Sequence, residues 1–537
     1  MNAKALIGLA LGIAGFAAAM LVPLNGLELS AQITLGIFVL AAVFWITEPI
    51  PIFATSMLVI LLQVILLSSQ GIVFSVRTAP LAETEMNATG ALVVPATVIN
   101  DAGVLYLNAE DKSARAIKPA TIVPLGDDRV AVTGPGLDET ARVIADPMHR
   151  SITVKSTPYA TFYATLASPI IILFMGGFAL AAAAVKFGLD LSLTRVLLKP
   201  FGTKPAFVCL GLMLCTGTLS AFMSNTATTA MMMTVVLPIV ATMSPTDPFR
   251  KGIALAIPVA ANIGGIATPI GTPPNAVALA ALKDAGYTVS FSSWMMLATP
   301  FAIVMLVFAW WLLVKLFKPA TNHFELNLSG SFNKSPKALI SYAIFAITVL
   351  LWVTEKVHGI STSMVAFLPV ALLPALGVLD KKDIRGFSWE VLWLMAGGIS
   401  LGLSMKDTGL AAWLIGQVSW ATLGNAGVVV VFGLVGFVLA NLVSHTVSST
   451  IIMPLAISVG ATLAATGNFN LVGAVVAIAV IISLAMALPI STPPNAIAMS
   501  TGVIESKDLT KTGLIVGLVG VTLSVLLGLT LWPALVS

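Results

Sequence analysis

The sequence predicts an α-helical polytopic membrane protein, built as an inverted repeat of about eleven spans plus two re-entrant hairpins, with a small inserted periplasmic β-domain. Three observations predict this fold. Of the 537 residues, 58% are hydrophobic and only 9% are charged, whereas a soluble domain carries about 25% charged residues. Motifs of the first half recur in the second half, and one polar stretch interrupts the apolar pattern. A soluble enzyme and a disordered chain are thereby excluded.

Apolar segments long enough to enter a bilayer recur along the whole chain, since roughly 20 apolar residues suffice for one span. They lie at 4–24, 32–48, 52–68, 162–186, 205–240, 251–285, 292–316, 337–355, 360–379, 388–405, 424–458, 471–503 and 511–534. The first segment is similar to a signal peptide. We expect it to be retained as a span, because hydropathy resumes directly after it.

The chain contains two copies of one pattern. The segment FMSNTATTAMMMTVVLPI at 222–239 matches LVSHTVSSTIIMPLAI at 442–457, with the Ser-x-Thr cores 220 residues apart. The segment PIGTPPNAVAL at 269–279 matches PISTPPNAIAM at 489–499 with the same spacing. The two halves are therefore homologous copies.

The first copy also carries an insertion. Residues 44–57 match 351–364 at a spacing of 307 residues, whereas the later motifs recur at a spacing of about 220. The difference means that the first copy contains about 86 additional residues. They fall within 70–157, which holds 10 of the 23 acidic residues. Short runs rich in Val, Ile and Thr there predict strands at 91–99, 103–109, 118–125 and 128–134. The insertion is therefore expected to be a small β-domain.

The charges of the loops predict the topology. Lys and Arg side chains between the apolar segments fall on one side if 205–240 and 424–458 are re-entrant hairpins, and that side is cytoplasmic. The N-terminus is then cytoplasmic, while 70–157 and the C-terminus are periplasmic. Five crossings separate the starts of the two copies. Because five is odd, the copies are inverted, as in secondary transporters.

The expected organisation follows from the repeat. Each copy contains a hairpin followed by a broken helix, at 205–240 and 251–285 in the first copy and at 424–458 and 471–503 in the second. The divisions are N-terminal scaffold spans at 1–69, the β-domain at 70–157, the rest of the first repeat at 158–318, a cytoplasmic linker at 319–336 and the second repeat at 337–537.

Polar residues lie at the centre of both hairpin segments. Backbone that leaves helical geometry inside a membrane must line a cavity or be covered by protein, and two hairpin tips that meet satisfy this condition. The alternative is a pair of long helices whose Ser and Thr side chains pack against neighbours. The central polar residues include Ser220, Ser224, Asn225, Thr226, Ser444, His445 and Thr446.

Two consecutive prolines break each of the next apolar segments, at Pro273–Pro274 and Pro493–Pro494. A broken helix exposes carbonyls that can bind a cation and amides that can bind an anion. Asn275 and Asn495 are placed to cap the second half-helices. The alternative is a simple proline kink.

No charged residue accompanies the hairpin tips or the double prolines. An anion would therefore be held by hydroxyls, amides and helix dipoles, and a bound cation would be the dominant local charge. This favours a site in which sodium binding allows a dianion to bind.

These motifs resemble the divalent anion:sodium symporter family over nearly the whole chain except 70–157. The resemblance implies transport of dicarboxylates, citrate or sulfate by an elevator mechanism in a homodimer. It implies a first sodium site of Ser220, Ser224, Asn225 and carbonyls near Gly271. It also implies a substrate site of Ser224, Asn225, Thr226, Thr272, Ser444, His445, Thr446 and Thr492.

The second hairpin departs from the pattern of that family. The usual Asn is His445, and Ala440 stands where a hydroxyl is common. An imidazole is a poor ligand for a hard cation, which puts a second sodium site of Ser444, His445 and Ser491 in question. We hypothesise that His445 replaces one Na⁺, either by taking up H⁺ or as a polar contact to the substrate. A hydrogen-bonded structural histidine is the alternative.

The insertion resembles the membrane-proximal β-domain of periplasmic adaptor proteins. The shared pattern is a Val-Pro start, a strand pair around an Asp-Gly-like turn, and a final Gly-Leu and Val at Gly136, Leu137 and Val143. This resemblance implies a bacterial inner membrane and a periplasmic partner that binds 70–157.

The resulting hypothesis is a sodium-coupled carrier of a small dianion similar to a C4 dicarboxylate. The alternatives are a carrier of sulfate or another oxyanion, an anion exchanger, and a non-transporting anchor or sensor for the β-domain. An enzyme is not expected, because the sequence shows no catalytic Ser/His/Asp arrangement, metal-spaced His cluster or phosphate-binding loop. The net charge of +4 reflects cytoplasmic loops beside membrane lipid, and no nucleic-acid partner is expected.

Overall fold

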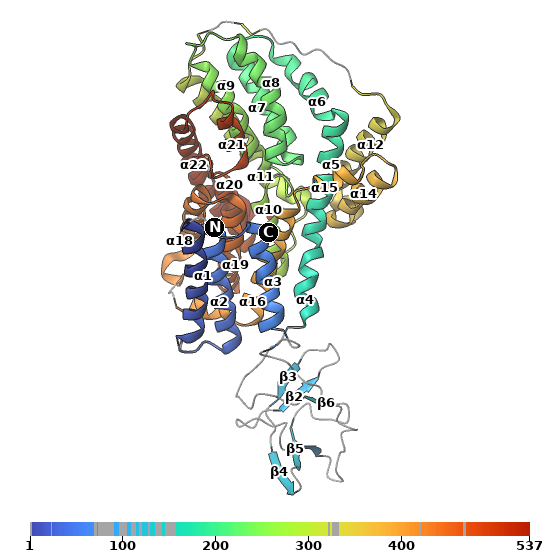
Figure 1. The fold of residues 1–537 in the computed structure, drawn as a ribbon, viewed down its shortest axis with the longest axis vertical. Coiled ribbons are helices and arrows are strands. Elements are labelled where there is room, and N and C mark those ends of the chain that lie inside the picture. Colours follow the sequence, from blue (N-terminus) through green and yellow to red (C-terminus); the bar gives the residue numbers. More distant parts are fainter. Residues whose placement is uncertain are drawn as a thin grey trace. The chain divides into compact units, whose positions relative to one another are not determined.

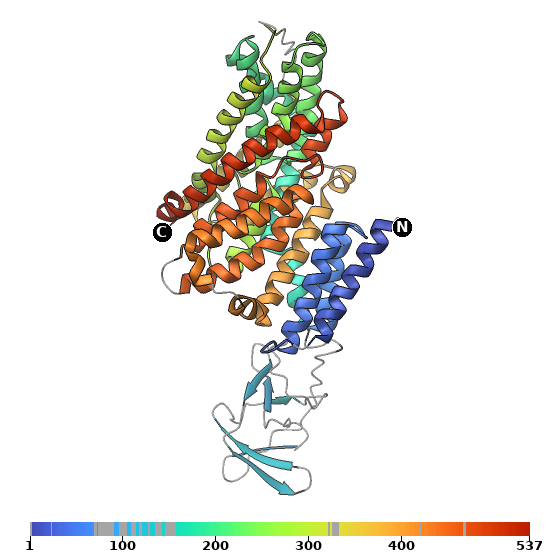
Figure 2. The same cartoon turned by 90° about the vertical axis from the view of Figure 1, so that its left-hand side faces the viewer.

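The protein is described by a computed structural model of the full chain (Figures 1 and 2). The described residues are 3–22, 24–68, 72, 91–95, 105–108, 114–117, 121–126, 129–134, 142–144, 157–320, 323–324, 332–417, 420–465 and 469–536. The chain divides into two compact units. Unit 1 comprises Met1–Leu166 and Ser400–Val418, and unit 2 comprises Ala167–Ile399 and Ser419–Ser537.

The helices of unit 1 come mainly from the N-terminal segments. They are α1 (Ala3–Leu21), α2 (Leu29–Thr47), α3 (Ile52–Leu66), α4 (Tyr159–Ala164), α17 (Leu410–Gly416) and the end of α16 (Trp389–Asp407). The buried Gln63 links α3 to α16. Its Nε2 donates to Ser404 Oγ at 2.8 Å and to the Ser400 carbonyl at 3.0 Å, while Ser400 Oγ donates to its Oε1 at 2.5 Å. A polar side chain is tolerated here because each of its hydrogen-bonding groups is paired.

Six short strands lie within the predicted insertion and form two antiparallel three-stranded sheets. The first sheet has the order β1-β5-β4 and the second β3-β2-β6. The strands are β1 (Leu92–Pro95), β2 (Leu105–Asn108), β3 (Ala114–Ile117), β4 (Thr121–Gly126), β5 (Arg129–Thr133) and β6 (Arg142–Ile144). The four predicted strands are confirmed as β1, β2, β4 and β5, whereas β3 and β6 were not predicted. A separate periplasmic domain at 70–157 stays a prediction.

Unit 2 contains the same sequence of helical elements twice. The first series is α5 (Pro169–Phe187), α6 (Leu189–Leu198), α7 (Pro205–Phe222), α8 (Asn225–Thr242), α9 (Phe249–Gly265), α10 (Pro273–Asp284) and α11 (Phe291–Leu316). After α12 (Pro336–Val353), α13 (Glu355–His358), α14 (Thr362–Ala375) and α15 (Lys381–Arg385), α16 opens the second series. It continues with α18 (Trp420–Leu442), α19 (His445–Ala465), α20 (Leu471–Ser483), α21 (Pro493–Ser500), α22 (Ser506–Leu529) and α23 (Leu531–Val536).

Both predicted hairpins and both predicted helix breaks are present. The helices of the hairpins meet at Met223–Ser224 and at Val443–Ser444, and the broken helices are interrupted at 266–272 and 484–492. Within unit 2, α7 and α8 lie toward one end and α18 and α19 toward the other (Figure 1), as inverted copies require. Thr272 and Thr492 have the same backbone angles, φ −146° and ψ 144°, so the two breaks share one geometry.

The helices of unit 2 are apolar enough to lie in a bilayer and approach one another closely. Eight of the described helical segments in the whole chain are long and apolar enough to cross a membrane, while the total of eleven spans and the re-entrant path of the hairpins stay predictions. A Cβ added at Gly264 would collide with the backbone of Gly217, so α9 and α7 are in backbone contact. Small residues at such crossings are typical of membrane helices.

An exposed ion-pair cluster joins the two series at the starts of α9 and α22. Lys251 Nζ lies 2.8 Å from Glu505 Oε1 and 2.8 Å from Asp508 Oδ2. Lys251 and Lys507 lower the pKa of Glu505 to about 2, so the Glu505 carboxylate is ionised at neutral pH. The cluster links the start of α9 to the start of α22. Both of these helix ends are predicted to face the cytoplasm.

Candidate functional site

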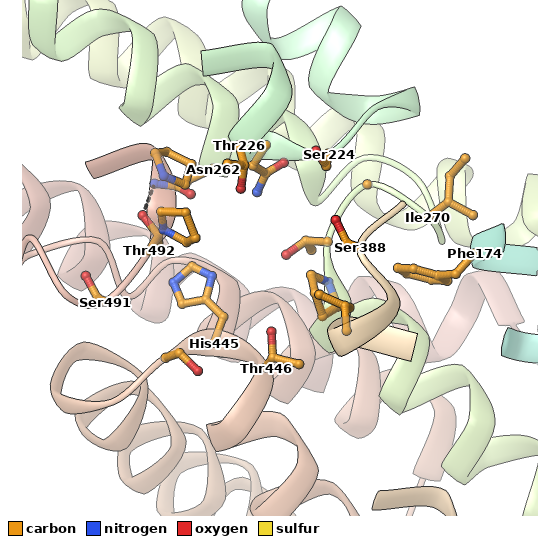
Figure 3. A pocket seen from close by; sticks show the side chains of 18 of the residues that line it. Phe174, Ser224, Thr226, Asn262, Ile270, Ser388, His445, Thr446, Ser491 and Thr492 are labelled. Carbon is orange, nitrogen blue, oxygen red and sulfur yellow. Dashed lines mark hydrogen bonds between the residues drawn. The ribbon is translucent and has the colours of Figure 1, made fainter. Parts of the chain in front are cut away.

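A cavity of about 130 Å³ lies in unit 2 where both hairpin tips and both helix breaks converge (Figure 3). His445 and Thr446 lie across this cavity from Ser224 and Thr226. The lining residues are Phe174, Phe178, Ser224, Asn225, Thr226, Asn262, Ile270, Gly271, Thr272, Pro273, Ser388, Val391, Ser444, His445, Thr446, Ser491, Thr492, Pro493 and Pro494. All eight residues predicted to bind substrate are therefore brought together.

The cavity has no acidic residue, lysine or arginine among its described lining residues, and four helices begin at its wall. Helices α8, α10, α19 and α21 all begin at its wall, and each helix N-terminus carries roughly half a positive charge. Ser224 and Ser444 accept hydrogen bonds from the amides of Ala227 and Val447, each at 3.2 Å. Both hydroxyl hydrogens thus remain available to an anion.

The first hairpin tip gathers oxygen atoms around the amide of Asn225. One terminal atom of this amide lies 2.5 Å from Ser220 Oγ, 3.0 Å from the Gly271 carbonyl oxygen and 3.2 Å from the Ala261 carbonyl oxygen. The amide nitrogen can donate to these acceptors. If the amide oxygen takes that position instead, four oxygens face one another and need a cation between them. Oxygen ligands of this kind suit a hard cation such as Na⁺.

The glycines of the first copy leave the space that this cluster occupies. A Cβ added at Gly265 would lie 2.5 Å from Asn225 Oδ1 and 2.9 Å from the Gly271 carbonyl oxygen. A Cβ added at Gly271 would in turn collide with the Gly265 backbone. Of the predicted first-site residues, Ser220 and Gly271 both contact Asn225. Ser224 is the N-cap of α8, which begins at Asn225.

The second hairpin tip lacks the oxygen cluster. Ala440 and His445 stand 220 residues after Ser220 and Asn225. His445 is 6% exposed, and its Nε2 lies 2.6 Å from the Ala485 carbonyl oxygen. Because a carbonyl only accepts hydrogen bonds, Nε2 carries the hydrogen and donates it. Of the residues predicted for a second sodium site, Ser444 and Ser491 also line the cavity, but His445 offers a nitrogen in place of an oxygen.

The asparagines of the two Thr-Pro-Pro-Asn motifs hold the helix breaks in shape. Asn275 Nδ2 donates to the carbonyls of Gly265, Ile266 and Thr268 at 3.1, 3.2 and 2.8 Å. Asn495 Nδ2 donates to the carbonyls of Met486 and Leu488 at 3.0 and 2.9 Å. The prediction that these asparagines cap the second half-helices is therefore wrong. They pair carbonyls at the end of α9 and within the two breaks, and Thr272 and Thr492 occupy the N-cap positions.

Several lining residues were not predicted. Ser388 and Val391 enter the cavity from the start of α16, and Phe174 and Phe178 enter from α5. Asn262 enters from α9, in a helix whose other described residues from Gly252 to Gly265 are also buried. The available signal for Asn262 was its polarity within the apolar run IPVAANIGG, where the second copy has Ile482.

Comparison with known proteins identifies the family. The sequence model described as "Sodium:sulfate symporter transmembrane region" matches residues 147–537. The chain belongs to this family, the divalent anion:sodium symporters. It is 31% identical over 405 residues to a sodium-dependent dicarboxylate transporter of Staphylococcus saprophyticus, covering 68% of this chain and 76% of the relative. The protein is therefore a multi-pass membrane transporter of the sodium:anion symporter class, with a small anion as substrate.

The relatives of the chain are named for different substrates. The chain is 28% identical over 394 residues to a sodium-dependent dicarboxylate transporter of Staphylococcus aureus, covering 66% of this chain and 75% of the relative. It is 30% identical over 303 residues to an inorganic phosphate transporter of Saccharomyces cerevisiae, covering 55% of this chain but only 32% of that longer protein. Membership of the family alone thus leaves the choice between carboxylate and oxyanion open.

Proposed function

We propose that the protein carries a C4-dicarboxylate-like dianion across a bacterial inner membrane, driven by sodium. The observation that carries this proposal is the neutral cavity between the two hairpin tips, with four helix N-termini at its wall and the Asn225 oxygen cluster beside it. A cavity of about 150 Å³ accommodates a molecule the size of benzene. The present 130 Å³ thus suits a compact dianion. The dicarboxylate transporters among its relatives support the same class.

Sodium would act through the orientation of Asn225. Without the ion, the amide nitrogen can pair with Ser220 Oγ and the Gly271 and Ala261 carbonyls. With Na⁺ among these oxygens, the amide must turn its oxygen toward the ion. The N–H groups of Asn225, which lines the cavity, are then directed away from the cluster and become available to a carboxylate. Ion binding thereby favours substrate binding through one side chain.

We further propose that only the first copy binds sodium. The second copy has no side-chain oxygen at Ala440, and His445 is bonded to the Ala485 carbonyl. A dianion moves inward with net positive charge only if at least three cations accompany it. With two cations uptake is electroneutral and the membrane potential contributes no driving force. With one cation the complex carries one negative charge inward, so the potential opposes net uptake and favours exchange of one dianion for another.

The arrangement in the membrane is proposed from the sequence and the family. Both hairpins and both broken helices would move together as a transport domain, while 1–69 and the equivalent spans of the second repeat form a scaffold that dimerises. The N-terminus would be cytoplasmic, and 70–157 and the C-terminus periplasmic. The strands at 92–144 would form the surface for a periplasmic partner.

The first test is uptake of labelled succinate by proteoliposomes with and without an inward sodium gradient. We expect uptake only with the gradient, and competition by unlabelled dicarboxylates. Sulfate and hydrogen phosphate serve as competitors, because strong competition by sulfate with no effect of dicarboxylates would favour the oxyanion carrier. Absence of sodium-driven uptake by protein that elutes as a single folded species would contradict the proposal.

A further inference from the structure

Asn262 presents an unpaired hydrogen-bond acceptor at the wall of the cavity. The residue is 1% exposed and lines the cavity from α9, and Figure 3 shows it bonded to Thr492. Its Nδ2 donates to Thr492 Oγ1 and to Asn495 Oδ1, each at 3.3 Å. Its Oδ1 has no hydrogen-bond partner. A buried acceptor without a partner is unfavourable, and each such case in a folded protein calls for an explanation.

The orientation of the Asn262 amide is determined by its neighbours. Asn495 Nδ2 is committed to the Met486 and Leu488 carbonyls, so Asn495 must present its oxygen to Asn262. Only the nitrogen of Asn262 can meet that oxygen. The Oδ1 of Asn262 is therefore the end that is left without a donor, because a rotation of the amide would set it against Asn495 Oδ1 and break that hydrogen bond.

The polar group is not required by the repeat architecture. The equivalent residue of the second copy, 220 positions later, is Ile482, which is fully buried. An aliphatic side chain thus satisfies the packing of this helix position. The amide of Asn262 is a feature of the first copy alone, in the wall of the candidate substrate site.

We infer that Asn262 Oδ1 accepts a hydrogen bond from a hydroxyl group of the transported dianion. A dianion without a hydroxyl offers only further acceptors, which leave Oδ1 unpaired and repel it. A dianion with a hydroxyl donor satisfies it. The carrier would therefore prefer a hydroxydicarboxylate to an unsubstituted dicarboxylate, and a hydrogen-bearing oxyanion to one without hydrogen. This inference rests on the proposed function, because it assigns the substrate class of the same cavity.

The test compares two matched pairs of probes in sodium-driven uptake: malate against succinate, and hydrogen phosphate against sulfate. We expect the wild type to bind the hydroxyl-bearing member of a pair about tenfold more tightly, as one well-placed hydrogen bond provides. Asn262→Leu removes the acceptor at similar volume and should bring the ratio close to one. A preference in the first pair identifies a hydroxydicarboxylate, and a preference in the second pair alone identifies phosphate.

The ratio of affinities separates a specificity role from a structural one. A merely structural residue would lower uptake of both members of a pair by the same factor and leave the ratio unchanged. Asn25→Leu, at an exposed asparagine, is the control and should leave both affinities unchanged. A wild type with no preference in either pair, or an Asn262→Leu variant that keeps the wild-type ratio, would overturn the inference.

A second readout keeps this test independent of transport. Ligand-induced shifts of the melting temperature, measured in sodium, report binding of the same four probes to purified protein. If sodium drives no uptake but malate or phosphate still protects the protein in an Asn262-dependent way, the proposed function fails and the inference about Asn262 stands. If sodium drives succinate uptake but the wild type binds both members of each pair equally, the proposed function stands and the inference about Asn262 fails.

Discussion

Sodium-driven uptake should be lost in a Gly265→Ala variant. The added Cβ would lie 2.5 Å from Asn225 Oδ1 and 2.9 Å from the Gly271 carbonyl oxygen, so it fills the position around which the sodium ligands gather. The amide can move aside, but the backbone carbonyl of a helix break held by Asn275 cannot do so freely. Overpacking of this kind costs about 1–3 kcal/mol; if that cost falls on the sodium-bound state, sodium affinity drops by about fivefold to 150-fold.

The measurement is the sodium concentration that gives half-maximal uptake, or half-maximal thermal stabilisation where uptake is too small. Gly416→Ala is the matched control, because a Cβ at this exposed glycine meets no atom within 4 Å. The Gly416→Ala control should elute and melt like the wild type and keep its sodium dependence. An unaltered sodium dependence in Gly265→Ala would mean that sodium binds elsewhere.

A second sodium ion should bind when the second copy is given the ligands of the first. The double variant Ala440→Ser with His445→Asn restores the side-chain pair found at Ser220 and Asn225. It also releases the Ala485 carbonyl, to which His445 Nε2 donates at 2.6 Å. We expect the number of sodium ions carried per dianion to rise by one. At 100 mV each added charge contributes about 2.3 kcal/mol, or about a fortyfold higher limit of accumulation.

Reversal potentials of reconstituted protein, measured at several sodium and substrate gradients, give this stoichiometry directly. Ala440→Ser alone should leave the ratio unchanged, because the imidazole still occupies the position. If the double variant transports with the wild-type ratio, then either the second copy already binds sodium or His445 does not occupy the ion position. A lower ratio would contradict the proposal outright.

The parts of the site that the sequence predicts are those created by strong local breaks. Consecutive prolines cannot continue a helix, and the second copy repeats them at the same spacing, so the convergence of Thr272 and Thr492 on one cavity was predictable. Ser224 and Ser444 could likewise be identified from the sequence, because they are polar residues in the middle of long apolar segments. Each hairpin or proline motif alone has a simpler interpretation, but their recurrence in both copies specifically predicts a shared binding site.

The parts that were missed depend on contacts between distant segments. Asn262 is one polar residue in a buried helix, and its neighbours Thr492 and Asn495 lie 230 and 233 positions away. Asn275 and Asn495 were predicted as helix caps from local position alone. Their actual partners are carbonyls at the end of α9 and within the two breaks. Strand β3 (Ala-Arg-Ala-Ile) and strand β6 (Arg-Val-Ile) are too short to show a clear alternation of apolar and polar residues.

The neutral wall of the cavity has a consequence for how the carrier resets. A binding site that contains an ionised side chain takes that charge with it when it crosses the membrane empty, and the crossing then gains or loses about 2.3 kcal/mol per 100 mV. Here no described lining residue is Asp, Glu, Lys or Arg, and the helix ends contribute only partial charges. Under the proposed mechanism, with the imidazole of His445 uncharged, the unloaded return moves no ionised side chain of this lining, and the current arises from the loaded step.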